Sequence, residues 1–231
     1  MTIYHRHFLL YLKQWVEDLP PVLLSEICPS PKRTAIISVD VINGFCTEGS
    51  LSSPRVQKIV KPITQLFNRA WEYGINNIVL TQDTHEPDAV EFGSFPPHCV
   101  RGTIEAETVP EFKELPFFSQ MTVLEKNSIH SGINTGLYEW MAEHQDVADY
   151  IVVGDCTDLC VYQLAMHLRL DANARQQNRR VIIPADCVDT YDMSVSTAAK
   201  IGAMPHDAEL LHAVFLYHMA LNGIVIVKSI Q

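Results

Sequence analysis

Reactive side chains follow four short apolar runs of the sequence, at or soon after the residue where each run ends. They are a carboxylate, a carboxylate with an imidazole, an amine and a thiol: Asp40, Asp83 with His85, Lys126 and Cys160. Open parallel sheets bind ligands outside the carboxyl ends of their strands. If the four runs are strands of one sheet, these groups are expected to meet at a single edge.

Cys160 is the candidate nucleophile. It follows a polar turn after the run 150–153 and begins a stretch with helical spacing. The N–H groups and positive potential of a helix N-terminus lower the pKa of a thiol and can form an oxyanion hole. An isolated cysteine is more often a small buried apolar residue, but the strand–turn–helix setting favours the catalytic interpretation here.

A cysteine nucleophile normally needs a base, and Asp40 and Lys126 are the charged residues at other predicted strand ends. A buried Asp40 can take the thiol proton and deliver it to a leaving amine, while the ammonium of Lys126 favours the thiolate. The alternatives are a turn or cap role for Asp40 and a solvated loop position for Lys126.

The segment 83–98 has the composition of a metal site. Asp83 and His85 flank one residue, so their side chains share a face on extended backbone. Glu91 and His98 can fold back across a proline-bounded loop. Imidazoles combined with carboxylates suit a divalent ion such as zinc, with iron and manganese as the other candidates, rather than calcium or magnesium. The alternative is an exposed polar loop.

Predicted strands and helices alternate along the chain. β-branched runs predict strands at 34–40, 77–81, 121–124, 150–153, 181–183 and 224–227. Helical spacing of apolar residues predicts helices at 3–18, 54–73, 160–175, 192–203 and 206–221. Pro62 is expected to kink the second helix or to begin a new segment. The alternation predicts an α/β fold, a three-layer α/β/α sandwich with a mostly parallel central sheet, and the irregular segment 83–116 is expected to be functional.

Length and charge narrow the classes of protein. The chain has 231 residues and a net charge of -10, with 17 Lys and Arg against 27 Asp and Glu, which argues against nucleic-acid binding. No stretch approaches the roughly 20 apolar residues of a membrane span, and no secretory signal is found. We therefore expect no membrane partner and a cytoplasmic protein whose six cysteines are reduced.

We expect an N-terminal helix and extended connection over 1–33 and a single α/β domain over 34–231. The N-terminal helix is expected to pack against the sheet or against a second subunit of a homo-oligomer. His206, His212 and His218 lack a metal-binding spacing, which favours a solvent or interface face for them.

Five motifs together resemble the isochorismatase-like cysteine hydrolases, and within them the nicotinamidases. They are Val39-Asp-Val-Ile-Asn-Gly-Phe-Cys46, Asp83-Thr-His85, Phe95-Pro-Pro-His-Cys-Val-Arg-Gly-Thr103, Glu125-Lys126 and Gly154-Asp-Cys-Thr-Asp-Leu-Cys-Val161. The resemblance implies the isochorismatase-like hydrolase fold and a cis peptide at Asp155–Cys156. The catalytic triad that it implies is Asp40, Lys126 and Cys160.

The same resemblance places a metal site at Asp83, His85 and His98. Glu91 stands where the family usually has a third histidine, and a glutamate can ligate the same metals. Ile42 and Gly44 depart from the family's first motif. Both positions stand close to Asp40 in the sequence, so the pocket edge and the hydrogen bonds around this aspartate are expected to differ from those of the family.

The resemblance implies an amidohydrolase that forms a thioester, with nicotinamide hydrolysed to nicotinate and ammonia. The backbone N–H groups of Cys156 and Cys160 would hold the oxyanion, Phe45 and Phe95 would wall the ring, and a metal ion would hold a ring nitrogen. Two alternatives stay open. One is a hydrolase of another small amide, an N-carbamoyl or ureido compound or an ester; the other is a non-catalytic scaffold, against which the intact triad argues.

Overall fold

A parallel sheet forms the centre of the protein. The computed structural model describes residues 3–231, with side chains from residue 5 onward; the first two residues of the predicted segment 1–33 lie outside the described residues. The strand order is β4-β3-β2-β5-β6-β8, and β7 pairs with the end of β5. All of these pairings are parallel. The strands are β2 (Thr34–Val39), β3 (Asn77–Asp83), β4 (Thr122–Lys126), β5 (Asp149–Asp155), β6 (Arg180–Pro184), β7 (Val188–Asp189) and β8 (Val225–Val227).

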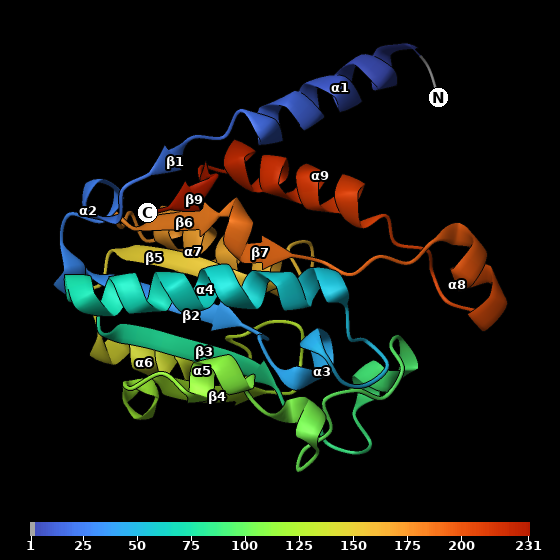
Figure 1. Ribbon diagram of the computed structural model, residues 1–231. Coiled ribbons are helices and arrows are strands. Elements are labelled where there is room, and N and C mark those ends of the chain that lie inside the picture. Colours follow the sequence, from blue (N-terminus) through green and yellow to red (C-terminus); the bar gives the residue numbers. More distant parts are fainter. Residues whose placement is uncertain (1–2) are drawn as a thin grey trace.

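Helices cover both faces of this sheet, because successive side chains of a strand point to opposite sides. Ile36 and Ile78 belong to the core on the α4 face, whereas Ile37 and Val79 belong to the core under α6, α7 and α9. Figure 1 shows α4 lying along the sheet. The helices of these two layers are α4 (Pro54–Tyr73), α6 (Leu137–Glu143), α7 (Cys160–Ala174) and α9 (Ala208–Leu221). The predicted three-layer α/β/α sandwich is confirmed.

Helix α4 is a single element of 20 residues, so Pro62 does not begin a new segment, and a kink at this position stays a prediction. Ser53 caps its start by accepting a hydrogen bond from the N–H of Arg55, and Gly74 ends it in the left-handed region. Pro62 removes one N–H from the helical ladder. The buried residues Ile59 and Ile63 lie on either side of it, so packing on the sheet carries the helix through this position.

The N-terminal helix α1 (Ile3–Glu17) packs on α9 rather than on the sheet, which corrects the prediction of a sheet contact. The rings of Phe8, Tyr11 and Trp15 lie 5.6, 6.0 and 5.3 Å from the ring of Tyr217. Helix α9 already covers this part of the sheet, as Figure 1 shows, and α1 lies over it. Contact with a second subunit stays a prediction.

Short elements complete the chain. Strand β1 (Pro21–Val22) pairs with β9 (Ser229–Ile230), which joins the N-terminal segment to the C-terminal end. The short helices are α2 (Leu24–Ile27), η1 (Pro31–Arg33), α3 (Asn43–Cys46), η2 (Val90–Gly93), η3 (Ile104–Ala106), α5 (Pro110–Lys113), η4 (Phe118–Gln120), η5 (Ala185–Cys187) and α8 (Val195–Ile201). Among the helices of residues 3–231, none is long and apolar enough to cross a bilayer.

A glycine permits the close approach of the two central strands at the edge where the reactive residues lie. Gly154 in β5 pairs with Val39 in β2 and has a φ of +111°. A Cβ atom on it would lie 2.0 Å from the carbonyl oxygen of Val39. Only glycine fits there, and it holds the turn that follows β5 against the residue that follows β2.

Candidate active site

Three fully buried side chains meet at the carboxyl edge of the sheet: Asp40 after β2, Lys126 at the end of β4 and Cys160 at the start of α7. The Nζ atom of Lys126 lies 2.8 Å from Asp40 Oδ2 and 3.8 Å from Cys160 Sγ. It also donates to the carbonyl oxygen of Ser128 at 3.1 Å. The ammonium therefore links a carboxylate to a thiol inside the protein, as the strand-end positions of the three residues predict.

The backbone holds the carboxylate of Asp40 in place. Asp40 has a φ of +56°, which is uncommon for a residue other than glycine. Its own N–H donates to the carbonyl oxygen of Thr81, and its Oδ1 accepts from the N–H of Asp83, each at 2.8 Å. These two contacts fix Oδ1, so that Oδ2 faces Lys126.

Burial controls the protonation of this cluster. It raises the pKa of Asp40 to about 7, with a further rise from the charge of Asp83 and an opposing effect of Lys126. Burial also raises the pKa of the Cys160 thiol well above its ordinary value. The ammonium of Lys126 lowers this pKa, and the carboxylates of Asp40 and Asp83 raise it. The expected low thiol pKa is therefore not met, because desolvation outweighs the ammonium. This balance favours the thiol form of Cys160, so a nucleophilic role requires a neighbouring group that accepts its proton.

A second cluster lies beside the first. One donor atom each from Asp83, His85 and His98 lies within 4.8 Å of the others. The Nε2 atoms of the two histidines are 3.5 and 3.9 Å from the carboxylate oxygens of Asp83. Glu91 is not part of this group, although it lines a cavity together with Asp83 and His98. The structure thus brings together three of the four predicted ligands.

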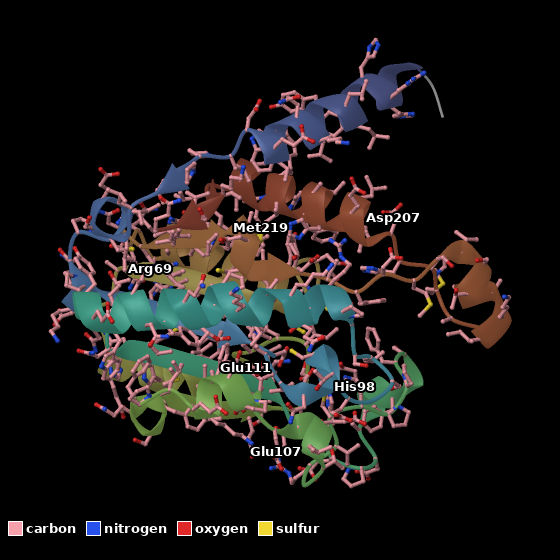
Figure 2. All side chains as sticks on the ribbon, viewed as in Figure 1. Arg69, His98, Glu107, Glu111, Asp207 and Met219 are labelled. Carbon is pink, nitrogen blue, oxygen red and sulfur yellow. The ribbon has the colours of Figure 1, made fainter. Side chains whose placement is uncertain are left out.

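The histidines of this cluster are oriented as metal ligands usually are. The Nδ1 atom of His85 lies 2.9 Å from Asn127 Oδ1, and the Nδ1 atom of His98 lies 2.8 Å from the carbonyl oxygen of Pro96. Such contacts hold a ring so that its other nitrogen faces the ion. The Nε2 atom of His85 is buried and has no hydrogen-bond partner among residues 3–231. Two imidazoles and a carboxylate with an unsatisfied buried nitrogen fit a divalent ion. Figure 2 places His98 in the loops beside α3.

Both clusters face one cavity, which is lined by Asp40 and Cys160 from the first cluster and by Asp83 and His98 from the second. The predicted ring contacts Phe45 and Phe95 both line it, as does Cys156. The peptide bond between Asp155 and Cys156 is cis, as the resemblance implies. Within the part of the chain that the structure describes, the N–H groups of Cys156 and Cys160 donate to no other backbone group. Both N–H groups are therefore available to an oxyanion.

Five further residues line the cavity and were not predicted: Leu51, Ile129, Asp155, Leu159 and Tyr191. The apolar members lie in loops with no periodic pattern, so the sequence offers no signal for them. Asp155 differs, because a carboxylate that ends an otherwise apolar strand is visible in the sequence.

Two of the three histidines near the C-terminus contact the turn between β5 and α7, so the predicted solvent face is wrong for them, and an interface position stays a prediction. His206 Nε2 lies 2.7 Å from Asp158 Oδ2, and its ring stacks on Tyr191 with centroids 4.0 Å apart. His212 Nδ1 lies 2.8 Å from Thr157 Oγ1. The spacing of these histidines did not reveal partners that come from a turn about 50 residues earlier in the chain.

The parallel sheet between two helical layers, with a buried lysine, carboxylates and a thiol at its carboxyl edge, places the protein in the α/β class. The sequence profile of the Isochorismatase domain matches residues 34–212, and the chain belongs to this family. Nicotinamidase 1 of Arabidopsis thaliana is 29% identical to the present chain over 237 residues, and the match covers 94% of this chain and 92% of the relative. The nicotinamidase/pyrazinamidase of Mycobacterium tuberculosis is 31% identical, over 57% of this chain and 76% of the relative.

Solved structures share the fold. The structure of the pyrazinamidase of Pyrococcus horikoshii in complex with zinc superposes with a TM-score of 0.66 and 24% identity, covering 85% of this chain and 99% of the other. The two chains therefore share a fold.

Proposed function

We propose that the protein hydrolyses nicotinamide to nicotinate and ammonia through a thioester on Cys160. The observation that carries the proposal is the position of the Lys126 ammonium between Asp40 Oδ2 and Cys160 Sγ, at 2.8 and 3.8 Å, next to a small cavity. The nicotinamidase names of the relatives, one of them aligned over 94% of the chain, support an amide as the substrate.

In the proposed reaction Asp40 takes the proton of the Cys160 thiol, and the thiolate attacks the carboxamide carbon. Lys126 stabilises the negative charge as it passes between the carboxylate and the sulfur. The N–H groups of Cys156 and Cys160 hold the oxyanion. Asp40 then gives the proton to the leaving ammonia, and water hydrolyses the thioester.

Asp83, His85 and His98 are proposed to hold a divalent ion, for which zinc is the first candidate because their ligand set suits it and a pyrazinamidase of the same fold was solved with zinc. When bound, the ion would offer a Lewis acid that fixes a ring nitrogen of the substrate. The aromatic rings of Phe45 and Phe95 line the cavity and can pack on the faces of that substrate ring.

Ammonia release from a panel of amides tests the function. The panel holds nicotinamide, pyrazinamide and an N-carbamoyl amino acid, each with the zinc-loaded protein. We expect the highest kcat/KM for nicotinamide or pyrazinamide. Release from the N-carbamoyl compound alone would overturn the nicotinamidase assignment and leave a different amidase on the same fold.

A further inference from the structure

A buried carboxyl group in the cavity has no role in the proposed reaction. Asp155 is the last residue of β5, is 1% exposed and lines the cavity together with Asp40 and Cys160. Its Oδ1 atom has no hydrogen-bond partner within residues 3–231. The only donor to its Oδ2 atom in that part of the chain is the thiol of Cys156, at 3.6 Å, and a thiol is a weak donor. Unsatisfied buried carboxyl groups are costly and rare in native proteins.

The protein around Asp155 offers no better partner. The nearby charged groups are Asp40, Asp83 and Lys126. The Nζ atom of Lys126 is already bound by both of these aspartates and by a backbone carbonyl. Burial raises the pKa of Asp155 well above its ordinary value, and the charge of Asp40 adds to this effect. In either protonation state the carboxyl group keeps an oxygen that accepts a hydrogen bond, so it can accept one from an N–H donor that enters the cavity.

The position of Asp155 indicates which part of a substrate supplies that donor. It lies near Asp40, which in the proposed reaction protonates the leaving amine, and it directly precedes Cys156, whose N–H is free to hold the oxyanion. In the proposed reaction the nitrogen of the scissile amide approaches Asp40 while its carbonyl oxygen faces the N–H of Cys156, which brings the nitrogen close to Asp155. A primary carboxamide carries two N–H groups there, whereas an ester of the same acid carries none.

We propose that Asp155 contacts the substrate and accepts a hydrogen bond from the N–H of the scissile carboxamide, so that the cavity selects primary amides over the matching esters. This inference rests on the proposed function for the position of the reacting group. It assigns substrate discrimination to a residue outside the Asp40–Lys126–Cys160 triad.

The test compares nicotinamide with methyl nicotinate in the zinc-loaded protein. Asp155→Leu removes the acceptor and keeps an apolar side chain of similar size. We expect its kcat/KM for the amide to fall about 10- to 100-fold, the effect of one buried hydrogen bond, and its kcat/KM for the ester to change less than about threefold. Asp155→Asn retains an acceptor oxygen and is expected to restore part of the amide rate.

Thermal unfolding separates this role from a structural one. Removal of an unsatisfied carboxyl group is expected to leave the unfolding midpoint of Asp155→Leu unchanged or raised. The matched control is Asp149→Asn at the opposite end of the same strand, where a buried carboxylate is paired with Arg180 at 2.7 Å. That control is expected to lower the midpoint and to leave the amide-to-ester ratio unchanged.

Two results would overturn the inference: an equal loss of both activities in Asp155→Leu, or a lowered midpoint with an unchanged ratio. A wild-type protein that cleaves a different amide would refute the nicotinamide assignment alone. The ratio would then be measured with that amide and its own methyl ester. A wild type that cleaves esters and no amide would overturn both proposals.

Discussion

Removal of the Lys126 ammonium should destabilise the fold strongly, because it leaves two buried carboxylates without their cation. Lys126 Nζ is completely buried and lies 2.8 Å from Asp40 Oδ2 and 2.5 Å from Asp83 Oδ1. Breaking a buried ion pair on one side typically costs about 3–5 kcal/mol. For a domain of this length each kcal/mol shifts the midpoint by about 2–4 °C, so Lys126→Met is expected to unfold about 6–20 °C below the wild type.

The assay is thermal unfolding at neutral pH in metal-free protein, because an ion at Asp83 would replace part of the lost positive charge. The matched control is Lys113→Met. Lys113 pairs with Glu107 at 2.6 Å, but both side chains are largely exposed, and such pairs contribute at most about 1 kcal/mol. If Lys126→Met and Lys113→Met unfolded within about 2 °C of each other, the argument that Lys126 neutralises the buried cluster would be refuted.

Three further predictions concern the turn after β5, the strand contact and the metal site. The Asp158–His206 pair is expected to stabilise the fold fully between about pH 4 and 6.5; its contribution falls at lower pH, through the lowered pKa of Asp158, and at higher pH, through the raised pKa of His206. Urea unfolding of wild type and His206→Gln at pH values below, within and above this window measures it, and a difference that is the same in all three would contradict it. Gly154→Ala is expected to lose at least about 3 kcal/mol of unfolding free energy, because its Cβ would overlap a strand carbonyl at a positive φ; a stable variant would show that the strands can separate. His98→Ala is expected to weaken zinc binding at least about 10- to 100-fold and Glu91→Gln much less, because Glu91 lies outside the ligand cluster; calorimetry that finds equal losses would make Glu91 a ligand.

The sequence predicted the fold well because its strands are buried on both faces. The strands 34–39 and 149–155 are buried throughout and carry continuous apolar stretches at their centres, as is typical of parallel strands between two helical layers. The strand-end rule then located the reactive groups without any tertiary information. Short elements such as α3 were missed because four residues carry no period.

The site was less predictable where it depends on burial and on distant contacts. The pKa of Cys160 is raised because desolvation outweighs the effect of Lys126, a balance that residue types do not reveal. The partnership of His206 with Asp158 joins positions 48 residues apart. Asp155 is visible in the sequence as a charged residue at the end of a buried strand, but its lack of a hydrogen-bond partner among residues 3–231 depends on the tertiary structure.

Replacement of the proposed nucleophile tests the account most directly. Cys160→Ala changes one buried atom, so the variant is expected to keep its unfolding midpoint within a few degrees of the wild type. Ammonia release from nicotinamide by the zinc-loaded variant is predicted to fall at least about 10⁴-fold, as when other enzymes lose their nucleophile. A folded Cys160→Ala protein that retained a tenth or more of the wild-type rate would contradict the thioester mechanism and the role assigned to this cysteine.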